Sequence, residues 1–415
     1  MIVPGIMLVV LAAGGLLMRA GLAAYASGLA RSKNAAGELM RSVCDLCVAT
    51  VAFWAVGAAI LLQRANGTFG IKPTLLLGWG LSDASSAGTA AACFFFAVMV
   101  LIASGIVSGA LAERSRFSAV CAASALMGGL LIPVIGHWAW FGWLQNLGFI
   151  DVGGAAVLHM TGGVCAAVGV VFVGPRAGKY NRDGSANGIP GHSVPLVVLG
   201  VTLMVAAWVP YVAGASLRNG AGRLDEDAVV AMAAFNVLVA GASGGAAALV
   251  LGRLRYGKPD VFLTSSGALG GLVAISASAP VVGSLAAAVI GALAGVIVPT
   301  ATVWLDLRWH LDDPSGGVAI HGVGGLWGTL AAGVFAPVGW AERFGRIAHQ
   351  ITGILVILVT VAVVSGLVFA GMKAVVGLRS KEADEYDGLD LAEHDINAYP
   401  DFQQTMIKSY HLREA

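Results

Sequence analysis

The sequence predicts an all-α polytopic membrane protein with eleven transmembrane helices. Of its 415 residues, 58% are hydrophobic and only 11% are charged, and the mean hydropathy is +0.83. Soluble domains carry about a quarter charged residues, so a soluble fold could not bury this much apolar surface. The 58 glycines fit closely packed helices in a bilayer. A formal net charge of +1 gives no reason to expect a nucleic-acid partner.

Apolar stretches of spanning length recur along the chain. A helix needs about 20 mostly apolar residues to cross the hydrocarbon core of a bilayer. Eleven stretches meet this requirement, at approximately residues 5–30, 39–63, 86–112, 116–136, 152–174, 193–216, 227–252, 262–278, 281–304, 317–336 and 347–377. We therefore expect a transmembrane domain over residues 1–378 and a polar cytoplasmic tail over residues 379–415.

The distribution of Lys and Arg predicts the orientation, because short cytoplasmic connections are rich in these residues. One set of connections, with the start of the tail, holds Arg31, Lys33, Arg41, Arg114, Arg116, Arg176, Lys179, Arg182, Arg253, Arg255, Lys258, Arg308, Lys373, Arg379 and Lys381. The opposite set holds fewer, namely Arg64, Lys72, Arg218, Arg223, Arg343 and Arg346. We expect the N-terminus outside and the C-terminus in the cytoplasm, as an odd number of helices requires.

A short pattern, H-x-x-G-G, occurs in the fifth and the tenth predicted helices. It reads His159-Met-Thr-Gly162-Gly163 in the first and His321-Gly-Val-Gly324-Gly325 in the second. Helices that are five apart run in opposite directions through the membrane. The pattern therefore predicts a 5+5 inverted repeat with a pseudo-two-fold axis in the membrane plane, and an eleventh helix outside it.

The two histidines of this pattern are the best candidates for chemistry. Ionisable residues inside a membrane span are costly and usually face a cavity or a partner. The inverted repeat would bring His159 and His321 together, where two neutral imidazoles can share one N–H···N bond and pass a proton near neutral pH. The alternative is two histidines that helix carbonyls or hydroxyls satisfy, with no role in conduction. A metal site is disfavoured, because no Cys or carboxylate accompanies the two imidazoles, and we expect no cofactor.

Other polar and aromatic residues allow two interpretations each. The outer loop 136–143, which includes Trp140, could be an aromatic belt or a cation–π site, and composition alone favours the belt. Asp151 could be a helix N-cap, a negative charge at the outer mouth, or both. The segment Asp312-Asp313-Pro314, which is acidic with a following Pro, has the composition of an ordinary helix start. Arg19 is a lone charge in the first helix and must find a partner or reach the interface.

Taken together, these segments resemble the ammonium transporter family (Amt, Mep and Rh proteins), of the bacterial Amt type, over nearly the full length. The resemblance rests on residues 21–34, 108–114, 117–118, 137, 140, 151–159, 195–200, 319–328, 388–394 and 398–399. It implies an eleven-helix protomer, usually in a homotrimer, with one pore per protomer in a cell membrane. It also implies that the tail couples protomers and meets a PII-type regulatory protein.

The resemblance also implies roles for single residues. His159 and His321 match the twin histidines of the family's pore, and Ser276 stands where the family has a pore-side Thr. Trp140 matches the outer aromatic residue that contacts arriving ammonium, and Asp151 matches the acidic residue below it.

The chain departs from the family at the outer gate. Two stacked phenylalanines of the family are replaced by Met99 and Tyr211, although Phe95 or Phe96 could supply a ring from an adjacent turn. The recruiting Ser falls at Ala215, unless Ser216 substitutes for it. We therefore expect the fold and the histidine pair to follow the family and the outer gate to differ.

The sequence thus predicts transport of ammonium or ammonia through a hydrophobic pore, without enzymatic activity. One alternative is an ammonium sensor with the same fold and little flux. An intramembrane enzyme that uses His and Ser would need a G-x-S-x-G or H-E-x-x-H arrangement, which we do not expect here. An unrelated ion-coupled transporter would need carboxylates at mid-membrane, and the nearest candidates, Asp45, Asp83 and Asp306, are expected too near helix ends.

Overall fold

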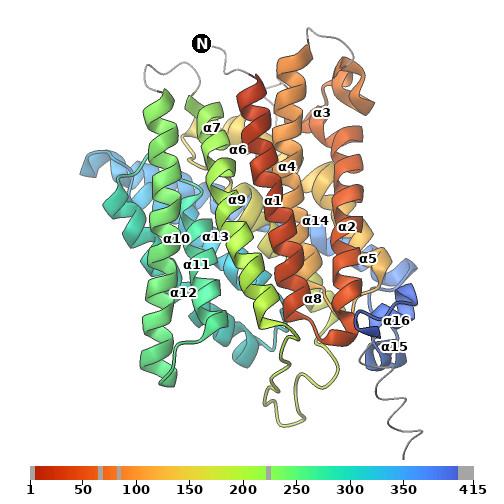
Figure 1. The fold of residues 1–415 in the computed structure, drawn as a ribbon. Helices are drawn as coiled ribbons and strands as arrows, with labels where there is room; N and C mark the ends of the chain where they lie inside the picture. Colours follow the sequence, from red (N-terminus) through yellow and green to blue (C-terminus); the bar gives the residue numbers. More distant parts are fainter. Residues whose placement is uncertain (1–4, 64–68, 82–85, 221–225, 401–415) are drawn as a thin grey trace, which may run out of the picture.

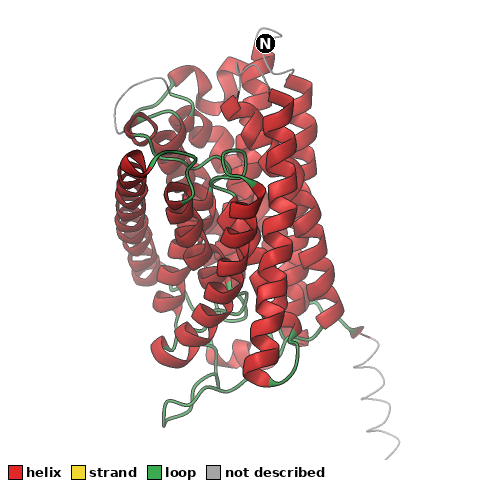
Figure 2. Cartoon of the chain, turned by 90° about the vertical axis from the view of Figure 1, so that its left-hand side faces the viewer, coloured by secondary structure: helices red, strands yellow, loops and turns green. Residues whose placement is uncertain are grey.

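A computed structural model of the protein describes residues 5–63, 69–81, 86–220 and 226–400. These residues form helices and loops, and no strand occurs among them apart from two isolated bridges (Figure 2). The long helices lie side by side in one bundle (Figure 1). Asp83, Arg64 and Arg223 lie outside the described residues, as does the end of the tail from residue 401.

The predicted helical membrane architecture is confirmed. Nine helical stretches among the described residues are long and apolar enough to cross a membrane, and two shorter apolar ones, Val261–Ile275 and Val318–Val334, complete the set. The helices that make up these stretches are α1 (Gly5–Leu29), α2 (Ala35–Ala52), α4 (Ala87–Ala110), α5 (Phe117–Leu126), α8 (Thr161–Val173), α9 (Val194–Gly220), α10 (Glu226–Tyr256), α11 (Val261–Ile275), α12 (Ser284–Trp309), α13 (Gly324–Val334) and α14 (Trp340–Val375).

Short helical pieces extend or connect these helices. α2 continues through the π-helical turn Phe53–Gly57 into α3 (Ala58–Leu61), and α5 continues through Met127–Leu131 into α6 (Ile132–Trp140). The remaining pieces are the 3₁₀ turns Ser32–Asn34 and Pro73–Leu81, α7 (Trp143–Leu147), α15 (Glu382–Asp387) and α16 (Leu389–His394).

The two halves of the repeat meet in a reciprocal contact between glycines. A Cβ on Gly163 would lie 2.2 Å from the backbone nitrogen of Gly322, and a Cβ on Gly325 would lie 2.7 Å from that of Met160. In each half, the second glycine of the H-x-x-G-G pattern therefore packs against the residue that follows the other histidine. A two-fold axis produces such a self-complementary contact. Helix α14 lies outside this arrangement and packs on α8 and α13.

The start of α1 and the helices α15 and α16 lie at opposite ends of the bundle (Figure 1), as an odd number of crossings requires.

A cluster of buried ion pairs lies at the tail's end of the bundle. Glu113 pairs with Arg31 and Arg176, each at 2.5 Å, and Arg176 pairs with Asp312 at 2.8 Å. Burial alone would raise the pKa of Glu113, but the two guanidinium groups hold it below its ordinary value. That this end is cytoplasmic stays a prediction.

The start of the tail is bound to the transmembrane helices. The carboxylate of Asp390 in α16 accepts the backbone N–H groups of Ala36 and Gly37, at 2.9 and 2.6 Å, at the start of α2. One turn later, Glu393 accepts the N–H of Phe117 at the start of α5 and pairs with Arg41 at 2.8 Å. Both carboxylates therefore satisfy the unbonded first amides of a helix and face the positive end of its dipole.

Arg19 has a partner that the sequence did not reveal. Its guanidinium forms an ion pair with Asp45 of α2 at 2.6 Å, and both side chains are buried. The expectation that Asp45 lies too near a helix end is therefore wrong, because it stands inside α2 and packs against the interior of α1 and α4. Asp306 does lie near the end of α12, where it pairs with Lys179 at 2.8 Å.

Candidate functional site

His159 and His321 meet in the interior, as the inverted repeat predicts. Their Nδ1 atoms are 3.2 Å apart, the ring centroids are 5.2 Å apart, and the ring planes differ by 21°. Both side chains are buried. At this distance the rings share one proton, so that one Nδ1 donates and the other accepts. Each ring then keeps its Nε2 atom for another partner.

Both histidines lie in π-helical turns, one of which begins four residues before His159 and the other three residues before His321. His159 belongs to the turn Ala155–Met160 before α8, and His321 belongs to the turn Val318–Val323 before α13. A π turn inserts an extra residue per turn and often marks a functional site. The same local distortion therefore aims each imidazole at the two-fold axis.

A carboxylate anchors each of these turns. Asp151 Oδ2 accepts the N–H groups of Ala156 and Val157 at 3.1 and 2.8 Å. Asp313 Oδ2 accepts the N–H of Val318 at 2.7 Å. Each aspartate precedes its histidine by eight residues (159 − 151 and 321 − 313). The composition around Asp313 predicts an ordinary helix start. The shared spacing D-x₇-H was the signal that would have identified it as the counterpart of Asp151.

Trp208 of α9 is a site residue that the sequence analysis did not select. Its ring stacks on His159, with centroids 5.1 Å apart and planes 22° apart. Its Nε1 donates a hydrogen bond of 2.9 Å to Ser276 Oγ, and that hydroxyl donates to the carbonyl of Leu272. Ser276 therefore orients Trp208, and Trp208 orients His159.

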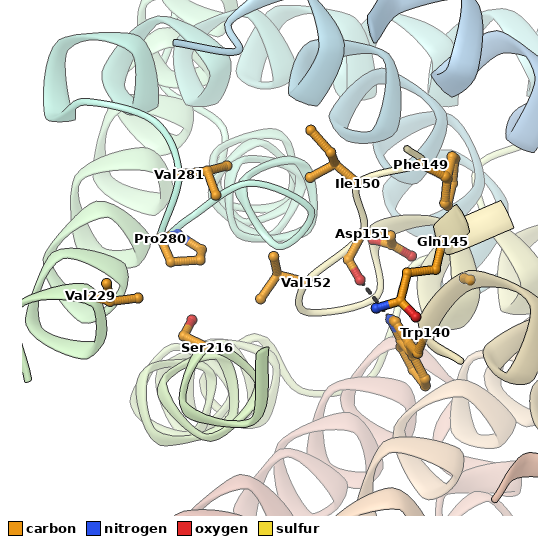
Figure 3. A pocket seen from close by; sticks show the side chains of 11 residues that line it. Trp140, Gln145, Phe149, Ile150, Asp151, Val152, Ser216, Val229, Pro280 and Val281 are labelled. Atoms are coloured by element: carbon orange, nitrogen blue, oxygen red, sulfur yellow. Dashed lines mark hydrogen bonds between the residues drawn. The ribbon is translucent and has the colours of Figure 1, made fainter. Parts of the chain in front are cut away.

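An outer cavity of about 280 Å³ lies above this centre (Figure 3). Trp140, Asp151 and Ser216 are among its lining residues, whereas Ala215 is not. Trp140 Nε1 donates to the backbone carbonyl of Asp151 at 2.6 Å. Ser216 donates to the carbonyl of Val212 at 2.7 Å, so its oxygen keeps lone pairs for an incoming donor.

Asp151 is nearly fully buried, and its Oδ1 atom has no hydrogen-bond partner among the described residues. Burial raises the pKa of Asp151 to about 7, although the amides of Val157 and Ala156 act in the opposite direction. The carboxylate therefore has an acceptor atom left over and titrates near physiological pH.

The side chains at the predicted gate positions are buried. Met99 and Tyr211 are both buried, and the Tyr211 ring contacts Trp208 edge to face with centroids 6.4 Å apart. The rings of Phe96 and Trp140 pack against each other, with centroids 5.6 Å apart, while Phe95 packs towards Gly214 of α9. Of the two phenylalanines, Phe96 is the one that contacts the outer aromatic residue.

A second cavity, of about 20 Å³, lies on the other side of the histidine pair. It is lined by His321 together with Leu22, Tyr25, Ala26, Gly105, Ile106, Gly109, Met204, Leu269, Ser315 and Gly317. This volume suffices for about one water molecule or a ligand of similar size. The inner cavity thus touches the imidazole pair through His321, whereas neither histidine lines the outer cavity.

A polytopic helical protein with paired imidazoles between an outer and an inner cavity belongs to the class of membrane channels and transporters. Within that class the family is clear. A profile of the Ammonium Transporter Family matches residues 6–399, and the chain belongs to this family. The resemblance drawn from its motifs is therefore confirmed.

Curated relatives and solved structures agree with this assignment. The chain is 35% identical to ammonium transporter Amt2 of Archaeoglobus fulgidus, over 93% of this chain and 86% of the relative. It is similar to a solved structure described as a sensor Amt protein, with 31% identity, a TM-score of 0.87 and coverage of 94% and 98% of the two chains. Mep2 of Candida albicans shares the fold, with 21% identity, a TM-score of 0.79 and coverage of 92% and 86%.

One motif expectation needs correction. The spacing G-x-S-x-G does occur, from Gly241 to Gly245. It lies inside the long helix α10, where Ser243 donates to the carbonyl of Ala240. The hydrolase motif requires a sharp strand-to-helix turn that exposes the serine. A helix interior does not supply this geometry, so the match carries no catalytic meaning.

Proposed function

We propose that this protein conducts ammonium across the cell membrane through a pore centred on His159 and His321. The observation that carries the proposal is the contact of 3.2 Å between the two Nδ1 atoms, with an inner cavity lined by His321. An ion that enters an apolar passage loses its hydration, which is expensive unless polar groups replace the water. A pair of imidazoles offers hydrogen bonds to a small polar molecule without adding a fixed charge.

In the proposed mechanism, the outer cavity receives the ammonium ion. The face of Trp140, the free Oδ1 of Asp151 and the hydroxyl of Ser216 replace part of its water. The buried group Met99, Tyr211 and Phe95 excludes hydrated ions. Ammonium gives up a proton there, which either returns to the outer water or crosses separately by the histidine pair. Neutral ammonia then passes the two histidines while they alternately donate and accept hydrogen bonds. Potassium has no proton to lose, so the same passage rejects it.

The test is the flux of ammonium and of potassium in proteoliposomes that contain His159→Ala or His321→Ala. Proton transfer by a positioned group contributes about 10²–10⁴-fold to a rate, so we expect a loss of ammonium selectivity of at least about 10²-fold. His310→Ala is the matched control, because His310 is exposed and its ring nitrogen Nε2 lies 2.9 Å from the carbonyl oxygen of Gly184. Unchanged selectivity in both variants would refute the role of the pair.

An ammonium sensor with little flux is the second candidate. Its support is the similarity at 31% identity to a structure described as a sensor Amt protein, together with the altered gate residues Met99 and Tyr211. Flux and binding in the purified protein separate the two functions. Saturable ammonium binding without measurable flux in liposomes would favour the sensor.

We further propose a homotrimer in the cell membrane, with no enzymatic activity, whose cytoplasmic tail (residues 379–415) couples protomers and receives a PII-type regulatory protein. The supporting observation is that Asp390 and Glu393 bind the ends of two transmembrane helices, so a movement of the tail acts directly on them. The mass of the purified protein in detergent tests whether it is a trimer.

The regulatory partner is tested by co-purification. A PII-type protein should co-purify with the full chain and not with a chain that ends at residue 378.

A further inference from the structure

The ion pair of Arg19 and Asp45 is a polar centre inside the membrane that the proposed mechanism does not use. Arg19 lies well inside α1, and its guanidinium donates to the carbonyls of Leu101 and Ser42, each at 2.9 Å. Asp45 accepts hydroxyl hydrogen bonds from Ser124 at 2.6 Å and Ser104 at 3.1 Å. The network therefore joins helices α1, α2, α4 and α5, and both charges are compensated.

The positive end of this pair is the end next to the inner cavity. Gly105 of α4 lines that cavity, and a Cβ on Gly105 would collide with Arg19 Nη1 at 1.7 Å. Leu22, one turn after Arg19 in α1, lines the cavity as well. Helix α2, which carries Asp45, contributes no residue to the lining. The guanidinium thus lies directly behind the wall at Gly105, and the carboxylate belongs to a helix that does not line the cavity.

We propose that Arg19 is a specificity-determining residue, which keeps cations out of the inner half of the pore and so ensures that the substrate crosses it as neutral ammonia. This inference rests on the proposed conduction of ammonium. Inside a membrane protein a charge acts over several ångströms with little screening. A pair whose positive end faces the cavity raises the free energy of ammonium, potassium and hydronium there, and it leaves uncharged ammonia unaffected.

The guanidinium of Arg19 lies inside the membrane and therefore needs Asp45 as a partner. An unpaired guanidinium in the bilayer would be costly, and Asp45 removes most of this cost. Had the pair pointed the other way, a carboxylate behind Gly105 would have attracted cations into the cavity. Reprotonation of ammonia is therefore delayed until the molecule has left the cavity beside His321.

The experiment compares proteoliposomes that contain the full-length protein with two neutral double variants. Arg19→Met with Asp45→Leu replaces the pair by apolar side chains of similar size, a change that buried ion pairs often tolerate. Arg19→Gln with Asp45→Asn keeps hydrogen-bonding groups. Arg19→Lys keeps the charge and serves as the control. Potassium flux and ammonium-driven current are measured in the same preparation.

We expect the neutral variants to lower the ratio of ammonium to potassium flux by about tenfold, which corresponds to ~1.4 kcal/mol, and Arg19→Lys to keep the ratio of the original protein. A folded neutral variant with an unchanged ratio would overturn the proposal. Failure of both neutral variants to fold would also overturn it, because the pair would then be a structural link. If the original protein moves no ammonium, the proposed function fails instead, and potassium rejection alone then measures the effect of Arg19.

Discussion

Asp151 and Asp313 occupy matching places in the two halves of the repeat, eight residues before His159 and His321, yet their surroundings differ. Asp151 lines the outer cavity, and its Oδ1 has no hydrogen-bond partner among the described residues. Asp313 lies at the tail's end of the bundle, where Ser315 donates to its Oδ1 at 3.4 Å and Val318 donates to its Oδ2.

The two halves of the repeat share a backbone arrangement but differ in the charges around it. The shared carboxylate holds a π-helical turn, which is a structural task that both halves need. Only the outer copy has a carboxylate oxygen without a hydrogen-bond partner among the described residues, and it borders a cavity of about 280 Å³, whereas Asp313 borders one of about 90 Å³. The inner half instead has the positive end of the Arg19–Asp45 pair behind its cavity wall. Structure is thus symmetric across the membrane, while electrostatics are not.

The glycine contact tests the symmetric part of this comparison and should give the largest effect. An alanine Cβ at Gly163 or at Gly325 would meet the backbone of the other half at 2.2 or 2.5 Å. Backbone cannot move aside, so Gly163→Ala and Gly325→Ala should each lower the free energy of unfolding by about 3 kcal/mol. Thermal unfolding of the purified variants in detergent measures this.

Helix α14 offers the matched control for this prediction. A Cβ on Gly366 or Gly371 would meet no atom within 4 Å. Gly366→Ala should therefore leave stability unchanged or raise it by about 0.5–1 kcal/mol, as alanine does in helices. If the two interface variants differed strongly from each other, the two-fold relation between the halves would not hold at this contact.

Asp151→Asn and Asp313→Asn test whether the two aspartates differ in their effect on ammonium binding. Asp151→Asn removes a charge that can bond directly to ammonium, worth about 1–3 kcal/mol, so the apparent affinity should fall by about tenfold or more. Asp313→Asn keeps an acceptor for Val318 and should leave the affinity nearly unchanged. Concentration-dependent currents on supported membranes give both values, and equal losses would show that the two carboxylates act only on their π turns.

Because the pKa of Asp151 is raised, we expect the affinity for ammonium to depend on pH. A carboxyl group with a pKa of about 7 carries its charge above that pH and loses it below. The affinity for ammonium should therefore fall as the external pH drops through about 7, and Asp151→Asn should abolish this dependence. The same titration on Asp313→Asn serves as the control, and it should retain the transition of the original protein.

How far the sequence predicted the site depended on whether a signal was local. H-x-x-G-G is a local pattern, so it identified His159 and His321 and the inverted relation of their helices. The pairing of Arg19 with Asp45 depends on how α1 and α2 are rotated about their axes, and apolar residues on all sides of a membrane helix conceal that rotation. Trp208 was not identified for the same reason, because only packing shows that its ring lies on His159.

The smallest predicted effect concerns the tail, at the end of the bundle where Asp313 lies. Asp390→Ala removes the acceptor for the N–H groups of Ala36 and Gly37, which should cost about 1 kcal/mol, as the loss of a helix cap does. Asp387 is exposed, so Asp387→Ala is the control and should change little. Hydrogen exchange of residues 35–40 should rise in the first variant only. Because Asp390 contacts α2 and not the histidine turns, ammonium selectivity should stay constant in both, and a change in selectivity would show that the tail reaches the pore centre.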